Sequence, residues 1–360
     1  MSSLLPKFAK TLCILVISWS VVQPRMIRAA SPTPANADEI KAKREKLRNA
    51  LKKLPHKIVF ESYRQKDWDL YAMNADGSGK VNLTKNPKVD ELYPHGSPDG
   101  KAICFVADEG RGRSRVRNVY VMAADGTGRS LVARNARQPC WGPKSRRILY
   151  TKGEYNRFTY SSYGTKGLFI YDLAKRKHHE HANRSIRHVC YLCWSPGGAW
   201  IFGTVAGGMG YARADLAIEA AGKSVYAVDR IWGCRMDVRP DGKKILWNMD
   251  DQSIYTADLD LSSKPPKISN PRAVVSCDWS EKVYHGDWSP CGKYIAFSHG
   301  SSDASQHVGE LALGWDICVG DASDTNVWVP LSTGGLSSKE PDWIKVAPKT
   351  KPTAVAKGDK

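Results

Sequence analysis

The sequence of 360 residues predicts an all-β fold in which six four-stranded antiparallel units close into a ring. Three observations lead to this prediction. A proline-containing turn recurs five times, a strand with alternating apolar residues follows each turn, and a sixth unit is split between the two ends of the ring-forming region. A regular repeat of short strands at this spacing is typical of a six-bladed β-propeller.

The composition agrees with short strands rather than with a helical bundle. The chain has 30 Gly, 20 Pro, 12 Trp and 15 Tyr. Glycine and proline favour tight turns, and aromatic residues favour strands. No stretch reaches the roughly 18 to 20 uninterrupted apolar residues that a membrane-spanning helix needs. A protein with several membrane spans and a disordered chain are therefore both excluded.

The formal net charge of +18 is unevenly distributed along the chain. Residues 1–30 contribute +4, residues 31–57 contribute +5 and residues 345–360 contribute +4, which leaves +5 on residues 58–344. The central region is therefore only mildly basic on average, and we expect no nucleic-acid partner spread over its surface. The basic ends favour an anionic envelope or polymer as their surroundings.

Residues 1–30 resemble a secretion signal. Lys7 and Lys10 precede an apolar run, Thr11–Val22, and the small residues Ala29 and Ala30 follow it. The run is too short to cross a bilayer but fits the apolar region of a signal peptide. We expect export to the periplasm or out of the cell, with cleavage after Ala30 or Ala37. An uncleaved anchor is the alternative.

Residues 31–55 are predicted to form a linker and a basic helix. Residues 31–37 are rich in proline and alanine, and residues 38–54 are mostly charged helix formers. Ile40, Leu47, Leu51 and Leu54 make a narrow apolar stripe that can lie on the surface of a domain. Pro55 ends the helix. The simplest interpretation is a solvated helix that caps the fold.

The repeated turn has proline at its second position and, in four of five copies, glycine at its fourth. Proline fixes φ, and glycine adopts the left-handed conformation that other residues resist. Because Ser145 replaces glycine in the second copy, we expect a looser hairpin there. The five copies are Ser97–Gly100, Gly142–Ser145, Ser195–Gly198, Arg239–Gly242 and Ser289–Gly292.

Each turn joins the first and second strands of a unit, and third and fourth strands follow. In two units the third strand runs into Asp-Gly sequences, at Ala75–Gly79 and Ala124–Gly128, which indicate a hairpin to the fourth strand. The unit around residues 207–233 is irregular. Its third and fourth strands are predicted at Ala214–Glu219 and Val225–Asp229.

The sixth unit is split. Glu340–Ile344 supplies an isolated first strand, and the stretch from Ile58 to Thr84 supplies the other three. Their pairing would close the ring and remove two exposed strand edges. The ring is predicted to span residues 56–346, followed by a basic disordered tail over residues 347–360. A seventh unit is the alternative if an insertion hides further strands.

These repeats resemble those of the TolB-like β-propeller family. The resemblance rests on Trp-Ser-Pro-x-Gly before an apolar strand, on the run from Asp69 to Ser78 and on Asn82–Thr84, and it covers about residues 56–345. It implies the propeller fold, whereas TolB's separate N-terminal α/β domain has no counterpart here. Because the matching residues form turns and packing contacts, the resemblance fixes no function.

Repeat symmetry selects one residue per unit as a candidate binding residue. Propellers bind ligands at the openings of their axial channel. We predict that the residues three positions before each turn-preceding Trp, or its equivalent, ring one mouth of the channel and bind a polar ligand or partner. The alternative is that they only solvate loops. The six are Tyr93, Gln138, Tyr191, Arg235, His285 and Glu340.

Cysteine positions also follow the repeat. Cys140 and Cys193 each lie one residue before Trp in consecutive units, and Cys190 and Cys234 each lie four residues before the Trp position. We predict the disulfides Cys140–Cys193 and Cys190–Cys234, provided that the Cα atoms approach to about 5.5–6 Å. Free buried thiols are the alternative. No metal or cofactor is expected, since the histidines at 178–181 are only a compositional hint.

The sequence therefore favours an exported, non-enzymatic propeller that binds an envelope protein or an anionic glycan, with residues Ser301–Gly314 as an adaptable contact segment. No nucleophile elbow, phosphate-binding glycine loop or paired-His zinc motif appears. The alternative is a polysaccharide-acting enzyme, since some uronate lyases resemble TolB-type propellers. Such an enzyme would use His285 or a His-bound metal, with Arg235 pairing a substrate carboxylate.

Overall fold

The structure is a computed structural model that describes residues 34–347 except 65, 111, 155–163, 206–212, 229–230, 232, 304–310 and 332. The predicted secretion signal lies outside the described residues, as do residues 31–33 of the linker and residues 348–360 of the predicted tail. Residues 304–310 of the predicted contact segment also lie outside them.

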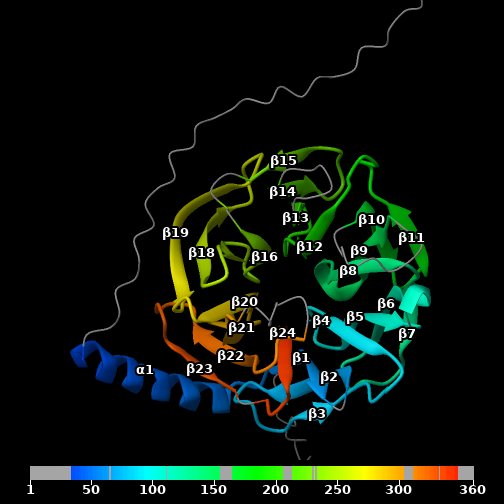
Figure 1. The fold of residues 1–360 in the computed structure, drawn as a ribbon. Coiled ribbons are helices and arrows are strands. Elements are labelled where there is room, and N and C mark those ends of the chain that lie inside the picture. Colours follow the sequence, from blue (N-terminus) through cyan, green and yellow to red (C-terminus); the bar gives the residue numbers. More distant parts are fainter. Residues whose placement is uncertain are drawn as a thin grey trace, which may run out of the picture.

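Six four-stranded antiparallel sheets surround a central axis as the blades of a propeller (Figure 1). The predicted fold and the predicted number of blades are therefore confirmed. The first blade has β24 (Ser337–Ile344) innermost, then β1 (Lys57–Arg64), β2 (Asp67–Asn74) and β3 (Val81–Asn82). The second blade has β4 (Asp90–Gly96), β5 (Ala102–Glu109), β6 (Val116–Ala123) and β7 (Ser130–Ala133).

The other four blades also begin with their innermost strand. The third contains β8 (Ala136–Trp141), β9 (Arg147–Gly153), β10 (Thr165–Asp172) and β11 (Lys177–Glu180). The fourth contains β12 (Val189–Trp194), β13 (Trp200–Val205), β14 (Ala214–Glu219) and β15 (Val225–Ala227). The fifth contains β16 (Cys234–Val238), β17 (Lys244–Asn248), β18 (Ser253–Asp260) and β19 (Lys267–Ser276). The sixth contains β20 (Glu281–Trp288), β21 (Tyr294–Ser301), β22 (Asp316–Asp321) and β23 (Trp328–Pro330).

The ring closes as predicted through the split blade. β24 pairs antiparallel with β1, and Trp343 lies opposite Ile58. The irregular unit also agrees with its prediction, because β14 covers Ala214–Glu219 and β15 begins at Val225. Asp229, the predicted end of that last strand, lies outside the described residues.

The repeated turns lie at one end of the channel, which we call the turn end. In the first copy the Gly100 amide donates to the Ser97 carbonyl at 2.7 Å, and Gly100 has a φ of +74°. A Cβ atom there would overlap the carbonyl oxygen of Lys345. The copy without glycine forms a short 3-10 turn, η2 (Pro143–Ser145), and Ser145 Oγ accepts a hydrogen bond from the Asp99 amide of the neighbouring blade at 2.9 Å.

The helix α1 (Pro34–Lys53) packs against the rim of the sixth blade. Leu47 and Leu51 of its apolar stripe are buried in one cluster with Val329 of β23. Arg44 donates to the carbonyl oxygen of Asn326 at 3.3 Å and lies over the ring of Trp328. The helix therefore covers the edge strand of this blade, which agrees with the predicted capping role. No described helix is long and apolar enough to cross a membrane.

Candidate functional site

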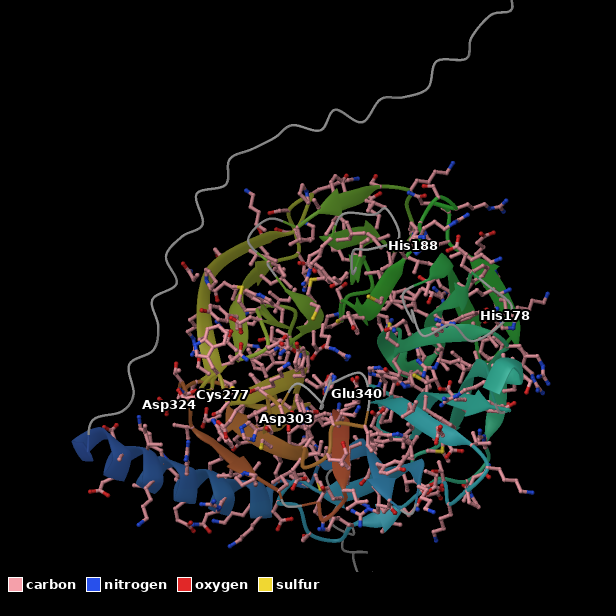
Figure 2. The ribbon with its side chains drawn as sticks, in the orientation of Figure 1. His178, His188, Cys277, Asp303, Asp324 and Glu340 are labelled. Carbon is pink, nitrogen blue, oxygen red and sulfur yellow. The ribbon has the colours of Figure 1, made fainter. Side chains whose placement is uncertain are left out.

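The axis of the ring contains a cavity of about 420 Å³. Residues from the innermost strands of all six blades line it, and Glu340 lies near the centre of the ring (Figure 2). The cavity walls include all six predicted site residues, which are Tyr93, Gln138, Tyr191, Arg235, His285 and Glu340. The structure thus brings together six residues that are spread over 248 positions of the sequence.

Each of the six residues is the first residue of a β-bulge. Two residues of each innermost strand face one residue of the second strand; Tyr93 and Pro94, for example, lie opposite Phe105. The other five register shifts lie at the equivalent places. All six residues have φ between +50° and +61°. This left-handed conformation costs a residue other than glycine roughly 1–2 kcal/mol.

The structure corrects the predicted place of these six residues in the fold. They lie within the innermost strands, on the wall of the channel, and not in the loops that lead into those strands. A β-bulge turns a side chain in a new direction, and it leaves one residue of the strand without a paired residue in the neighbouring strand. The repeat alignment selected six equivalent residues because the bulge keeps a fixed distance from the turn in every blade.

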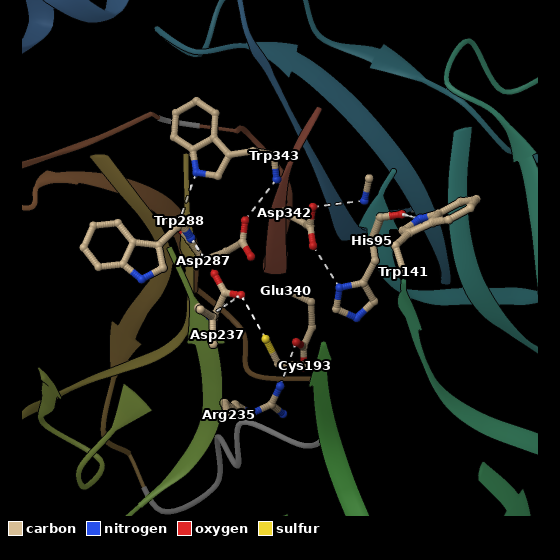
Figure 3. Close-up of polar contacts among 12 residues, drawn as sticks. His95, Trp141, Cys193, Arg235, Asp237, Asp287, Trp288, Glu340, Asp342 and Trp343 are labelled. Carbon is tan, nitrogen blue, oxygen red and sulfur yellow. Dashed lines mark hydrogen bonds and ion pairs between the residues drawn. The ribbon is translucent and has the colours of Figure 1, made fainter. Parts of the chain in front are cut away.

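Three of the six residues form one charged network. Arg235 Nη1 lies 2.8 Å from Glu340 Oε2 (Figure 3). His285 Nε2 lies 2.9 Å from Glu340 Oε1. These residues come from the fifth, first and sixth blades, so the Arg235–Glu340 pair joins two blades that are not neighbours in the ring. Arg235 also lies 4.1 Å from the centre of the Tyr191 ring.

The remaining residues of the set are fixed through backbone contacts. The Gln138 side-chain oxygen accepts a hydrogen bond from the Tyr191 amide at 2.8 Å. Glu61 Oε2 accepts one from the Tyr93 amide at 2.9 Å, and Arg117 lies over the Tyr93 ring. Burial raises the pKa of Glu61 to about 7, against the attraction of Lys339. The wall is therefore held by side chains that reach between blades.

The network fixes the protonation states of its members. Burial would raise the pKa of Glu340, but the attraction of Arg235 and the contact with His285 outweigh it and lower that pKa to about 2. Burial and the charge of Arg235 lower the pKa of His285 to about 4. His285 is therefore neutral near pH 7. Its Nδ1 accepts from the hydroxyl of Ser298 at 2.9 Å, and Nε2 lies 2.9 Å from Glu340 Oε1 without hydrogen-bond geometry.

The buried His285 predicts an acid-sensitive stability. Its pKa is about 4 in the folded protein, against 6.5 as the ordinary value, so the unfolded chain binds more protons between these pH values. Lowering the pH from 7 to 4 should therefore remove up to about 3 kcal/mol of the free energy of unfolding through this group. Below pH 4 the group should cause no further loss.

Urea unfolding of the wild type and of His285→Gln at several pH values measures this contribution. Glutamine can still accept from Ser298, but it does not titrate. We expect the variant to lose less stability than the wild type between pH 7 and pH 4. His179→Gln, at an exposed histidine of β11, is the control and should keep the full loss. Parallel pH profiles for wild type and His285→Gln would contradict the assignment.

A second ring of residues, which the sequence prediction missed, lies two positions further toward the turn end. It consists of His95, Cys140, Cys193, Asp237, Asp287 and Asp342, all of which line the cavity. The residue type at this position changes between blades, from His and Cys to Asp, so no single residue marks it. The signal that could have found it is the recurrence of Asp at this position in three blades.

The three aspartates each link their blade to the next (Figure 3). The backbone amide of Trp288 donates to Asp237 Oδ2 at 2.9 Å, and that of Trp343 donates to Asp287 Oδ2 at 3.2 Å. The amide of Gly96 donates to Asp342 Oδ1 at 3.0 Å. His95 Nδ1 donates to the other oxygen of Asp342 at 2.8 Å. The carboxyl groups thus connect four consecutive blades around the cavity.

Two of these carboxyl groups, those of Asp237 and Asp287, have raised pKa values. Burial raises the pKa of Asp237 to about 6, and burial together with the charges of Asp342 and Asp237 raises the pKa of Asp287 well above its usual range. Burial lowers the pKa of His95, but the hydrogen bond and charge of Asp342 outweigh it and raise that pKa.

The predicted disulfides Cys140–Cys193 and Cys190–Cys234 are wrong. All eight cysteines in the described part of the chain are free. The thiols point toward other acceptors, because Cys193 Sγ donates to Asp237 Oδ1 at 3.4 Å and Cys190 Sγ donates to the carbonyl of Thr204 at 3.1 Å. Equivalent positions in consecutive blades bring thiols near each other without aligning them for a bond. Burial raises the pKa of Cys140, which keeps it protonated.

Metal ligation finds no support in the described residues, which contain no group of three or more His, Cys, Asp or Glu side chains placed to hold an ion. The histidines at 178–181 contact different parts of the protein. His178 contacts the Tyr150 hydroxyl at 2.9 Å, whereas His181 contacts the carbonyl of Glu219 at 2.8 Å. The chemistry that the described cavity offers is therefore hydrogen bonding, charge and aromatic contact.

Comparison with known proteins agrees with the fold. No protein-family model and no curated protein matches the sequence. Among solved structures, TolB from Acinetobacter baumannii is similar at 16% identity and a TM-score of 0.55, over 83% of this chain and 70% of that one. A structure assigned to TolB of Agrobacterium tumefaciens is similar at 13% identity and a TM-score of 0.53, over 81% of this chain and 99% of that one.

Hydrazine synthase from Kuenenia stuttgartiensis is similar at 10% identity and a TM-score of 0.53, over 81% of this chain and 47% of that one. Identities this low establish the shared fold and not a shared activity. The repeated turns, the six blades and the split first blade all agree with that likeness. The chain is a TolB-like six-bladed β-propeller in its fold.

Proposed function

We propose that the protein is an exported, non-enzymatic binding or scaffold protein of the cell envelope, which holds a polar segment of a protein or glycan partner in its axial cavity. The observation that carries this proposal is the ring of six left-handed bulge residues around one cavity. Strained backbone of this kind is retained where a fold must direct side chains to a site.

The cavity suits an extended polar segment. Its volume of about 420 Å³ lies within the range of ligand pockets, roughly 300–1,000 Å³. Tyr93 and Tyr191 offer aromatic faces, Gln138 offers an amide, and the carboxyl ring offers acceptors. Pairing of Arg235 with Glu340 leaves the wall nearly neutral at that level, which favours an uncharged or mixed-charge segment over a single strong ion.

Export is supported by the sequence of residues 1–30 alone, with its two lysines, apolar run and following small residues. A fusion of residues 1–37 to a reporter that is active only outside the cytoplasm tests this part of the proposal. An inactive reporter would contradict export, but it would leave the proposed binding site unaffected.

A polysaccharide-acting enzyme is the second candidate. The convergence of His285, Arg235 and Glu340 in one cavity that also contains His95 favours it. Against it, Nδ1 of His285 already accepts a hydrogen bond from Ser298, and Arg235 already pairs with Glu340. A general base or a substrate-pairing arginine would have to give up these contacts first, so binding is the better-supported function.

The binding proposal is tested with a substitution on the cavity wall. Tyr191→Asn removes the aromatic ring, and asparagine tolerates the left-handed backbone at this position. Tyr226→Asn removes the same side chain from the outer strand β15 and is the matched control. Each protein is incubated with a solubilised envelope fraction, and recovered partners are identified by mass spectrometry.

We expect the wild type and the Tyr226→Asn control to recover the same partner, and we expect the Tyr191→Asn variant to recover much less of it. The wild type and Tyr191→Asn should have equal melting temperatures. Equal recovery by all three proteins would rule out the cavity as the binding site. Release of shortened oligosaccharides from an envelope polysaccharide by the wild type would instead favour the enzyme.

A further inference from the structure

The positive charge of the propeller is concentrated in its third blade. Residues 136–188 contain twelve Lys and Arg against three Asp and Glu, a net charge of +9. The rest of residues 58–344 carries a net charge of −4. The mild average charge of the central region therefore hides one strongly basic blade, because the remaining residues of the ring are weakly acidic in total.

Six of these bases meet at the turn end of the blade, and we call them the basic cluster. They come from the β8–β9 turn and the β10–β11 hairpin, which lie side by side because the amide of Leu173 donates to the carbonyl of Arg146 at 3.1 Å. Asp172 pairs in register with both Arg147 and Lys177. All six side chains are exposed. The cluster consists of Lys144, Arg146, Arg147, Lys175, Arg176 and Lys177.

The protein neutralises the cluster only in part: the backbone amide and the charge of Lys175, together with the charge of Arg147, lower the pKa of Asp172. Among the described residues, no ion pair within 4.0 Å joins any of its six bases to a carboxylate. The fifth blade differs, since Arg239 there pairs with Asp241 at 2.7 Å and Lys244 pairs with Asp258 at 2.7 Å. A lysine on an edge strand can serve to prevent strand association, which accounts for Lys177. It does not account for Arg146 and Arg147, which lie on the inner side of the blade.

The surroundings of the cluster favour a linear polyanion over a membrane. The exposed large apolar side chains of the described residues are Val81, Trp279, Leu313 and Leu336, none of which belongs to the third blade. A membrane-bound surface would need such side chains near its bases. The turns of the first and second blades at the same end carry Asp76, Asp99 and Asp125, which a flat anionic surface would have to approach.

The cluster is also unsuited to nucleic acid. Proteins that bind single strands stack the bases on exposed aromatic rings. Beside the cluster, the exposed ring of His178 on the outer rim already packs against Tyr171, with the ring centres 4.7 Å apart (Figure 2). Arginine guanidinium groups match carboxylates as well as phosphates in a two-point contact, so the bases of the cluster do not by themselves require a nucleic acid.

We propose that the basic cluster docks an anionic polysaccharide whose carboxylate groups pair with its arginines and lysines. Lys144 belongs to the cluster and also lines the axial cavity. A polymer that lies along the cluster would therefore reach the turn end of the channel. This site is separate from the cavity wall and does not depend on the partner proposed for the cavity.

Fluorescence anisotropy with a labelled decamer of galacturonate tests the proposal on the full chain. The test variant is Lys175→Ser/Arg176→Asn/Lys177→Ser; asparagine is chosen because Arg176 has a φ of +52°. The matched control, Lys88→Ser/Lys101→Ser/Lys293→Ser, removes three exposed lysines from other blades. In 50 mM salt we expect the test variant to bind at least tenfold more weakly and the control less than twofold more weakly than the wild type.

Four further measurements make the test decisive. Wild-type affinity should fall as salt increases to 200 mM, because charge pairs are screened. Tyr191→Asn, which alters the cavity, should bind the decamer as the wild type does, so that failure of one proposal is distinguishable from failure of the other. A neutral galactose oligomer should not bind. An oligonucleotide or anionic vesicles should not displace the decamer at equal charge concentration.

Several results would overturn the proposal. They are no binding of the decamer by the wild type, equal binding by the test variant, or equal losses in test and control variants. Tighter binding of the oligonucleotide or of the vesicles would assign the cluster to a different partner. Melting temperatures of the test and control variants are measured alongside, and we expect them to match the wild type because every side chain substituted in these two variants is exposed.

Discussion

A chain that ends at Gly335 is expected to lose the cooperative fold of the ring. This deletion removes β24, the innermost strand of the first blade. Trp343 and Ile344, both buried, would leave the core, and burial of each large apolar side chain contributes about 1.5–3 kcal/mol. The blade-to-blade hydrogen bonds to Asp342 and Asp287 and the buried Arg235–Glu340 pair would be lost as well.

These losses together are comparable to the roughly 5–15 kcal/mol by which a typical domain is stable. The truncated chain would also expose the edge of β1, which invites association between chains. We expect a broad, non-cooperative thermal transition in near-UV circular dichroism and aggregation in analytical ultracentrifugation. The control ends at Ala347 and keeps every described strand, so it should melt as the full chain does. A truncated chain with a sharp, wild-type transition would show that the ring does not depend on the closing strand.

The repeat made the blades predictable because a proline turn and the strands around it must recur whenever a blade recurs. Counting from the turn also identified the six bulge residues, since the bulge lies at a fixed offset in every blade. The same counting failed for Cys140 and Cys193. An equivalent position determines which cavity a side chain lines, but a disulfide depends on side-chain direction, and the Asp237 carboxylate attracts the Cys193 thiol instead.

Two other features were not obtained in this way. The carboxyl ring of Asp237, Asp287 and Asp342 occupies a position whose residue type varies between blades, so the recurrence of Asp in three blades is a weak sequence signal. The basic cluster was missed because the charge was summed over the whole ring. It becomes evident when the charge is counted for each blade separately. In both cases the necessary information was the assignment of each residue to a blade.

Replacement of Arg235 by Met is expected to lower the free energy of unfolding by about 3–5 kcal/mol, since it leaves the Glu340 carboxylate buried without its main partner. Against the effect of burial, the charge of Arg235 and the contact with His285 hold the pKa of Glu340 near 2, so the carboxylate stays ionised in the folded wild type at neutral pH. Without Arg235 its pKa should rise, because burial favours the protonated form. The variant should therefore recover part of its lost stability as the pH is lowered from 7 to 5.

A double-mutant cycle separates this pair from its surroundings. Glu340→Gln removes the charge but keeps the shape, and Arg235→Met/Glu340→Gln should be less destabilised than the sum of the two single variants by about 1–3 kcal/mol. Arg239→Met is the matched control, because that arginine pairs with Asp241 near the surface of the same blade and should lose at most about 1 kcal/mol. Equal, small losses for Arg235→Met and Arg239→Met would mean that water screens the channel pair as it screens the surface pair. A large coupling energy would establish instead that the fifth and first blades are joined across the cavity by charge, and that a ligand entering there must either fit around this pair or break it.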